Sequence, residues 1–328
     1  RPQSGRSSFR RKLTIPVELR IRIIISKRQF TVSSLAVLSI LIGCNPSSES
    51  MLNSAEDSGL VGAGESAGFS ADGLDALNRG IQSAVDEGRV AGMVTMLVRH
   101  GTVVQSTSFG YQDADKQIPM KSDAIFRIYS MTKPVTGVAM MIMYERGLWN
   151  LDDPVYKHIP EFAGLSVAEE SEDGEITLVP ADHPMTMKEL MAHTGGLTYG
   201  AYSQSAVDTL YQQENVLDRN SSQQAMIDKL AAIPLRQQPG SMWHYSVSTD
   251  VQGYIVEKLS GQTLPEFFEE QIFQPLGMVD SAFYVTAEEA DRFVKEVYDY
   301  GSNGELVPSP RLTRDYSKPP GRASGGGG

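Results

Sequence analysis

Apolar side chains recur at helical spacing in three separate segments of this chain. Apolar positions three and four residues apart place one face of a helix against a core, so each segment predicts an amphipathic helix. Each segment is also followed closely by a glycine, which readily takes the left-handed conformation in which helices commonly end. The predicted helices and their glycine stops are 74–85 with Gly88, 135–143 with Gly147, and 251–259 with Gly261.

Two shorter apolar runs, 93–98 and 103–109, lie between the first two predicted helices. Their length predicts strands, and their separation by His100 and Gly101 predicts that the strands form a hairpin. A hairpin that follows a helix indicates a mixed domain of helices and an antiparallel sheet.

Ser130 and Lys133 lie three residues apart where the second predicted helix begins. The sequence of residues 125–129 predicts an extended segment that leads into this helix. Pro134 is tolerated in the first turn of a helix, because its missing N–H needs no partner there. Side chains three apart share a helix face, so the lysine amine can reach the serine hydroxyl and make it a nucleophile without histidine. A helix N-cap beside a surface lysine is the commoner use of such a pair, so the pair alone leaves both interpretations open.

A second segment, 243–250, follows a turn and leads into the third predicted helix, so Tyr245 lies on a loop that enters a helix. Together with Ser130 and Lys133, this tyrosine makes the chain resemble the serine β-lactamase and penicillin-binding protein superfamily. Within that superfamily the resemblance is strongest to the class C β-lactamases and the related family VIII carboxylesterases. It runs from about Gly73 to the last residue. The other matching segments are 148–155, 190–197, 275–278 and 281–283.

The resemblance implies roles for these three residues. Ser130 would accept the acyl group, Lys133 would take the serine proton, and Tyr245 would pass a proton to the leaving group. A free lysine amine is protonated at neutral pH, so the identity of the base is left open and Lys133 and Tyr245 are treated as a coupled pair. An aromatic side chain packed beside Trp243 is the alternative interpretation of Tyr245.

The resemblance also implies an α/β (α+β) fold, in which helices flank an antiparallel sheet and a mostly helical subdomain completes the cleft. The family's third motif comes downstream of the segment that 324–328 resembles. We therefore expect this chain to stop before the C-terminal strands and before the second donor of the oxyanion hole. A disordered glycine tail is the alternative.

One position departs from the β-lactamase pattern. Val247 takes the place of an asparagine that, in the resembling β-lactamases, holds the side-chain amide of the lactam. Valine cannot make that hydrogen bond, so Val247 is predicted as a substrate-contacting position that favours esters over lactams.

Thr186 and Glu189 have the spacing of a capping box, which predicts a short helix that stops at Gly195 and Gly196. His193 near its end is a conceivable base, but in the resembling enzymes this turn shapes the fold. The five histidines of the chain show no spacing typical of metal ligands, so no metal and no cofactor are implied.

Charge is distributed unevenly along the chain. Of 29 Lys and Arg and 40 Asp and Glu, nine basic residues and one acid lie in 1–28, which leaves 20 basic and 39 acidic residues, a net of −19, in 29–328. A domain this acidic would repel phosphates, which argues against a nucleic-acid partner. The basic segment shows no periodic pattern and is consistent with upstream sequence translated ahead of the natural start.

Residues 27–44 have the pattern of a bacterial lipoprotein signal. Lys27 and Arg28 form the charged region, 35–43 is an apolar stretch too short to span a membrane, and Cys44 follows as in a lipobox. Cys44 is the only cysteine of the chain, so it has no partner for an internal disulfide. We therefore expect export and attachment to the bacterial cell envelope, on the periplasmic side, through a lipid on Cys44. A cysteine buried among apolar residues of a signal core is the alternative.

The expected organisation has three parts: a leader and signal over 1–44, a flexible tether over 45–69, and the catalytic domain over 70–328. The tether is rich in Ser, Gly, Ala and acids, with little to bury. It contains a Gly-x-Ser-x-Gly sequence around Ser66, but a nucleophile elbow needs a buried strand before it and a helix directly after it. Neither is predicted there, so Ser66 is not expected to be a nucleophile.

These patterns favour a serine hydrolase that forms an acyl-enzyme on Ser130 and acts on a small acyl ester or amide. Carboxylesterase activity on short acyl esters comes first because of Val247. A class C-like β-lactamase and a D-alanyl peptide hydrolase are the enzymatic alternatives. A non-catalytic, penicillin-binding-like sensor of cell-wall peptides is the alternative of another class.

Overall fold

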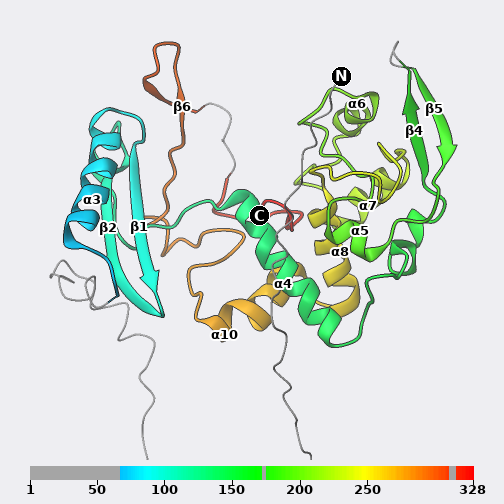
Figure 1. Ribbon diagram of the computed structural model, residues 1–328, viewed down its shortest axis with the longest axis horizontal. Coiled ribbons are helices and arrows are strands. Elements are labelled where there is room, and N and C mark those ends of the chain that lie inside the picture. Colours follow the sequence, from blue (N-terminus) through cyan, green and yellow to red (C-terminus); the bar gives the residue numbers. More distant parts are fainter. Residues whose placement is uncertain (1–66, 172–174, 310–314) are drawn as a thin grey trace, which may run out of the picture. The chain divides into compact units, whose positions relative to one another are not determined.

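The computed structural model describes residues 67–171, 175–309 and 315–328 (Figure 1). The chain divides into two units, 1–47 and 48–328, and all described residues belong to the second unit. Cys44, the signal segment and Ser66 lie outside the described residues, so what the sequence indicates for them stays a prediction. In the described part of the chain, no helix is long and apolar enough to cross a membrane.

The first described elements are a helix and a three-stranded antiparallel sheet. They are α3 (Ala71–Asp86), β1 (Gly92–Arg99), β2 (Thr102–Asp113) and β3 (Ile118–Pro119), with the sheet order β1-β2-β3. Helix α3 begins where the Ser70 side chain accepts a hydrogen bond from the backbone N–H of Gly73. The chain reverses at His100 and Gly101, whose φ angles of 50° and 76° suit a two-residue hairpin turn. The helix and hairpin predicted from the sequence are thus confirmed (Figure 1).

Two long helices form the centre of the hydrophobic core. They are α4 (Thr132–Glu145) and α8 (Ser248–Ser260), which pack against each other. Met140 and Met143 of α4 and Val251 and Ile255 of α8 are fully buried, and each such burial stabilises the fold by roughly 1.5–3 kcal/mol. Both helices end just before the glycines predicted to stop them, and these glycines take φ angles of 72° and 73°.

Shorter elements surround this helix pair. The helices are α5 (Met187–Met191), α6 (Ala206–Gln213), α7 (Gln223–Ala231), α9 (Leu264–Phe268) and α10 (Gln274–Leu276). Tighter or wider helical turns are η1 (Tyr129–Met131), η2 (Val155–Lys157), η3 (Pro160–Phe162) and η4 (Glu269–Phe273). Two more antiparallel hairpins pair β4 (Ser166–Glu170) with β5 (Ile176–Pro180), and β6 (Tyr298–Tyr300) with β7 (Leu306–Pro308). Helices combined with antiparallel sheets are the fold class predicted from the sequence.

The capping box of α5 is present, but the helix is shorter than predicted. Thr186 Oγ1 accepts the backbone N–H of Glu189 at 3.3 Å, and the Glu189 carboxylate accepts the backbone N–H of Thr186 at 2.9 Å. The helix ends at Met191, before the glycine pair, because His193 takes a left-handed φ of 57° that a right-handed helix cannot contain. His193 therefore lies on a turn.

Candidate active site

Ser130 lies on a strained turn in front of α4. The preceding Tyr129 has a φ of 42°, in the left-handed region that residues other than glycine seldom adopt. Ser130 belongs to η1, so it lies just before the helix and not in its first turn, where the sequence pattern placed it. The cap position of α4 is Met131, which makes no side-chain cap bond, so the N-cap interpretation of Ser130 is wrong. The turn presents the serine side chain at the N-terminal end of α4.

The three side chains predicted to act together meet at this turn. The Ser130 Oγ lies 2.9 Å from the Tyr245 hydroxyl and 3.3 Å from the Lys133 Nζ. Lys133 is on the first turn of α4 and Tyr245 is on the loop before α8, so the contact between these two helices brings the residues together. The serine oxygen is within hydrogen-bond reach of two groups that can exchange a proton with it, which is how a serine nucleophile is activated.

Aromatic rings hold Tyr245 in place. Tyr199 and His193 stack on it with ring centres 5.5 Å and 5.4 Å away, and Tyr202 meets it edge-on at 5.5 Å. The Lys133 Nζ lies 4.5 Å from the centre of the Tyr245 ring, within range of a cation–π contact. Burial raises the pKa of Tyr199 well above its usual range, so Tyr199 is a neutral stacking partner. The ring of Tyr245 is packed among aromatic side chains, as the alternative interpretation supposed, yet its hydroxyl reaches the serine.

His193 supports the loop that carries Tyr245. Its Nδ1 accepts the backbone N–H of Ser246 at 3.2 Å, so the ring proton is assigned to Nε2, which lies 3.4 Å from the Thr249 Oγ1. Burial, together with the charge of Lys133, lowers the pKa of His193 and keeps the ring neutral. The hydrogen bonds of His193 thus join the turn after α5 to the start of α8.

Val247 does not face the site. Its side chain is fully buried in the hydrophobic core, and its backbone N–H donates to the Thr198 carbonyl at 3.1 Å. An apolar side chain at this position gains more from the core than from a polar cleft. Direct contact between Val247 and a substrate, which the sequence led us to predict, therefore finds no support in the structure.

A backbone group that the sequence analysis missed completes the site. The Gly326 carbonyl accepts a hydrogen bond from the Lys133 Nζ at 2.6 Å, and the neighbouring Gly325 carbonyl accepts one from Thr136 of α4 at 2.7 Å. A run of glycines in a sequence indicates backbone freedom and says nothing of which carbonyl binds which side chain. No sequence signal could have identified this contact.

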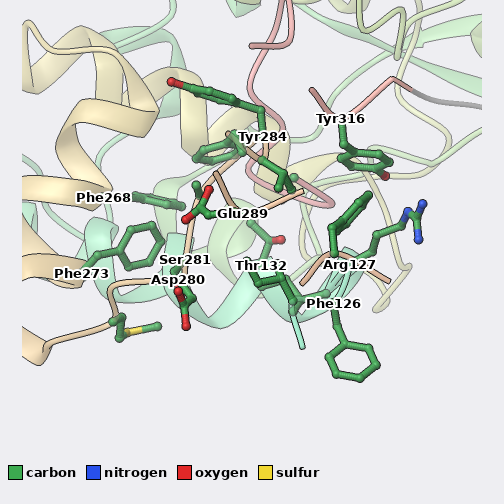
Figure 2. Close-up of a pocket in the computed structure, with 18 of the residues that line it drawn as sticks. Phe126, Arg127, Thr132, Phe268, Phe273, Asp280, Ser281, Tyr284, Glu289 and Tyr316 are labelled. Atoms are coloured by element: carbon green, nitrogen blue, oxygen red, sulfur yellow. The ribbon is translucent and has the colours of Figure 1, made fainter. Parts of the chain in front are cut away.

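A separate cavity of about 110 Å³ lies beside the same turn (Figure 2). Aromatic side chains such as Phe126, Phe268 and Phe273 line it, and Thr132 at the start of α4 adds a hydroxyl. Its Glu289 carboxylate already accepts hydrogen bonds from the backbone and side chain of Thr286. The three candidate catalytic side chains do not line this cavity, and the candidate site is instead the exposed surface around Ser130.

The polar groups at Ser130 suit proton transfer and nucleophilic attack. They are a serine hydroxyl, a lysine amine, a phenol and a backbone carbonyl. Elsewhere in residues 67–171, 175–309 and 315–328, no three His, Cys, Asp or Glu side chains gather so as to hold a metal ion.

Known proteins are similar to this chain in sequence and fold over most of its described residues. Protein Rv1367c of Mycobacterium tuberculosis (strain ATCC 25618 / H37Rv) is 33% identical over 75% of this chain and 59% of its own length. Esterase EstB of Burkholderia gladioli is 33% identical over 69% of this chain and 54% of its own length. The solved structure of EstCE1, described as a hydrolase with promiscuous acyltransferase activity, has a TM-score of 0.61 and 31% identity, covering 74% of this chain and 59% of that one.

The chain thus spans between half and two thirds of the length of these relatives. The family model described as Beta-lactamase matches residues 77–328, which is more than half of the chain and includes Ser130, Lys133 and Tyr245. The chain belongs to the β-lactamase family.

Proposed function

We propose that this chain contains the active site of a serine esterase that works through an acyl-enzyme on Ser130. The observation that carries the proposal is the position of the Ser130 Oγ, 3.3 Å from the Lys133 amine and 2.9 Å from the Tyr245 hydroxyl. Similarity to EstB, an esterase, and to EstCE1, a hydrolase, supports the same class of reaction.

In the acylation step, the Ser130 Oγ attacks the ester carbonyl carbon while its proton passes to the pair formed by Lys133 and Tyr245. The carbonyl oxygen becomes an oxyanion near the N-terminal end of α4, where backbone N–H groups and the helix dipole favour negative charge. The bond from the carbonyl carbon to the alcohol oxygen then breaks, and the pair gives its proton to the departing alkoxide. An acyl ester on Ser130 remains.

Water then hydrolyses the acyl-enzyme by the reverse path. The pair takes a proton from the attacking water, the bond between the acyl carbon and the Ser130 Oγ breaks, and the serine regains its proton. Because one N–H of Lys133 is donated to the Gly326 carbonyl, the rest of the amine is free to face the serine in both steps.

Exposed apolar side chains border the serine and support an apolar ester as the substrate. Met131, Tyr202 and Trp243 are 64%, 66% and 64% exposed, and the rings of Tyr202 and Trp243 lie 5.5 Å and 6.3 Å from that of Tyr245. Contact with an apolar acyl or alcohol group would remove apolar surface of both molecules from water.

Acyl transfer to an alcohol is the second candidate activity. The aromatic rim at Tyr202 and Trp243 could hold an acceptor alcohol where water would otherwise attack, and EstCE1 is described as having promiscuous acyltransferase activity. Both activities use the same acyl-enzyme, so they differ only in the molecule that attacks it.

Hydrolysis of p-nitrophenyl butyrate by the gene product that carries this chain tests the proposal. Ser130→Ala should lower kcat/KM by at least roughly 1000-fold, because a nucleophile that acts as part of a unit accounts for most of the rate. Ser66→Ala is the matched control and should retain activity. Undiminished hydrolysis by Ser130→Ala would rule out this nucleophile.

Three further assays on the same protein distinguish the other candidate functions of the site. Faster turnover of a cephalosporin than of the ester would favour a β-lactamase, and release of D-alanine from a peptide would favour a peptide hydrolase. Stable acylation of Ser130 by penicillin without turnover of any substrate would favour a sensor.

We also propose that the protein is exported and held at the bacterial cell envelope by a lipid on Cys44. The charged and apolar pattern of residues 27–43 supports this location. Stable anchoring to a bilayer usually needs more than one acyl chain, which bacterial lipoprotein modification supplies.

A further inference from the structure

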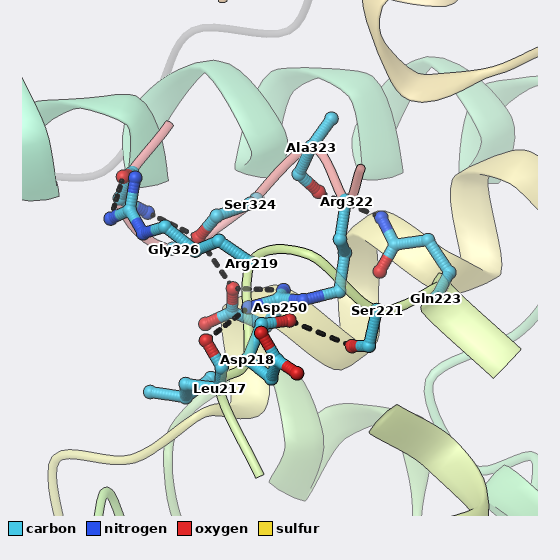
Figure 3. A network of polar contacts seen from close by, with 12 residues as sticks. Leu217, Asp218, Arg219, Ser221, Gln223, Asp250, Arg322, Ala323, Ser324 and Gly326 are labelled. Carbon is cyan, nitrogen blue, oxygen red and sulfur yellow. Dashed lines mark hydrogen bonds and ion pairs between the residues drawn. The ribbon is translucent and has the colours of Figure 1, made fainter. Parts of the chain in front are cut away.

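A buried ion pair adjoins the Ser130 site and has no part in the chemistry proposed above. Asp250, in the first turn of α8, is 0% exposed, and Arg322 is 2% exposed. The Arg322 Nη1 lies 3.1 Å from the Asp250 Oδ1, and the Ser324 hydroxyl donates to the same oxygen at 2.5 Å (Figure 3). A carboxylate removed from water needs such partners, because an unpaired buried charge is strongly unfavourable.

The chain segment after Arg322 is held along its length by side chains from other elements. Its carbonyls accept hydrogen bonds as follows: Ala323 from Gln223 at 2.7 Å, Gly325 from Thr136 at 2.7 Å, Gly326 from Lys133 at 2.6 Å and Gly327 from Arg219 at 2.9 Å. The Gly327 N–H donates at 2.9 Å to the Ser324 hydroxyl that donates to Asp250. Ser324 thus connects the Asp250 carboxylate to residues 325–328, the glycine segment, and this segment contacts Lys133 through the Gly326 carbonyl.

The backbone of the glycine segment lies in close contact with Thr249 and Asp250 at the start of α8. A Cβ on Gly326 would overlap the Asp250 carboxylate, and a Cβ on Gly325 would lie 2.5 Å from the Thr249 carbonyl oxygen. Glycine at both positions lets the backbone lie directly against the start of α8. The Gly326 backbone therefore lies against the Asp250 carboxylate, while its carbonyl binds the Lys133 amine.

We propose that Asp250 is a positioning residue for the Lys133 amine, acting through Ser324 and the Gly326 carbonyl. The inference rests on the proposed function, because it assumes that Lys133 takes part in proton transfer. With the carbonyl held in place, one N–H of Lys133 is fixed and the rest of the amine faces the Ser130 Oγ, 3.3 Å away. Misplacement of a reacting group by about 1 Å can lower an enzyme's turnover by about 100-fold, so a rigid carbonyl at this point matters.

Two variants weaken this link to different degrees, and a third is a matched control. Ser324→Ala removes the hydroxyl that joins Asp250 to the glycine segment and leaves the ion pair with Arg322. Asp250→Asn keeps an acceptor oxygen but leaves the Arg322 charge without its counterion. Ser260→Ala is the control: it also removes one serine hydroxyl, but at the C-terminal end of α8, where that hydroxyl donates to the Val256 carbonyl at 2.7 Å.

Ester turnover and a spectroscopic signal of Lys133 are measured on each variant of the gene product. With p-nitrophenyl butyrate, kcat should fall about 10- to 100-fold in Ser324→Ala, whereas KM should stay within about twofold of the wild-type value. The fall should be larger in Asp250→Asn, and Ser260→Ala should match the wild type. The ¹³Cε NMR signal of Lys133, assigned with Lys133→Arg, should move in Ser324→Ala and Asp250→Asn and stay in Ser260→Ala.

A wild-type kcat in folded Ser324→Ala would overturn the positioning role, whatever the melting temperature of that variant. If Asp250→Asn does not fold, Ser324→Ala decides alone, because it loses only one hydroxyl and keeps the buried charges paired. The Lys133 signal requires no turnover, so failure of the two proposals can be told apart. A wild-type protein without ester hydrolysis would refute the esterase, whereas an unmoved Lys133 signal in Ser324→Ala would refute the positioning role.

Discussion

Replacement of Tyr245 by phenylalanine removes one oxygen atom from the site and leaves the ring. The lost oxygen lies 2.9 Å from the Ser130 Oγ, whereas the ring keeps its stacking on Tyr199 at 5.5 Å and on His193 at 5.4 Å. Tyr245→Phe should therefore fold as the wild type does and lose one proton-transfer partner of the serine.

The expected magnitude follows from what remains in the site. A positioned general acid or base contributes roughly 100- to 10,000-fold, which corresponds to about 3–5.5 kcal/mol of activation free energy. Lys133 stays 3.3 Å from the serine and can still take its proton, so we expect the lower end, about 100-fold in kcat. The free energy of unfolding should fall by only about 1 kcal/mol, since one hydrogen bond is lost.

Stopped-flow measurement of p-nitrophenol release separates acylation from the steady state. Tyr245→Phe should slow the acylation burst and the steady state, with a melting temperature close to that of the wild type. Tyr254→Phe is the matched control, because it also removes one hydroxyl from a packed tyrosine ring, but that hydroxyl donates to Gln224 at 2.5 Å and takes no part in the Ser130 site. A wild-type burst rate in Tyr245→Phe would refute a role for the phenol in acylation and leave Lys133 as the base.

Two more predictions concern stability and location. Burial alone would raise the pKa of Asp208, but hydrogen bonds from Ser203, Thr198 and Ser205 lower it to about 2, below its ordinary 3.8. The carboxylate therefore contributes stability above about pH 4 that is lost as the pH falls to about 2, on the order of 2 kcal/mol. Urea unfolding should show Asp208→Asn less stable than the wild type at neutral pH and the difference shrinking near pH 2; an unchanged difference would contradict the assignment. In a bacterial host, Cys44→Ser should move the protein from the membrane fraction to a soluble or uncleaved form, whereas an unmodified Cys44 lost with a cleaved peptide would show an ordinary export signal.

Elements with local signals could be predicted from the sequence. Helices α4 and α8 end at the expected glycines, and the hairpin turns at His100 and Gly101, because periodicity and turn chemistry depend on neighbouring residues. The meeting of Ser130 with Tyr245, 115 residues away, could not be predicted from spacing. The resemblance to a known family predicted it.

Features set by tertiary contacts could not be predicted. The rings that stack on Tyr245 lie in the segment between α5 and α6, far from Tyr245 in the sequence. The contact of the Gly326 carbonyl with Lys133 involves a backbone group that every residue carries. The left-handed φ of Tyr129 is imposed by its surroundings, against the preference of a bulky side chain. The family motif placed Val247 at the substrate, but its side chain lies in the hydrophobic core, because burial of an apolar side chain is favourable.

Mass spectrometry of an acid-quenched reaction tests the central claim most directly. Protein mixed with p-nitrophenyl butyrate and quenched during turnover should carry one butyryl group, and the modified peptide should contain Ser130. Ser130→Ala should carry none, and Tyr245→Phe should form the adduct more slowly. A butyryl group on another residue, or undiminished turnover by Ser130→Ala, would contradict the assignment of Ser130 as the nucleophile.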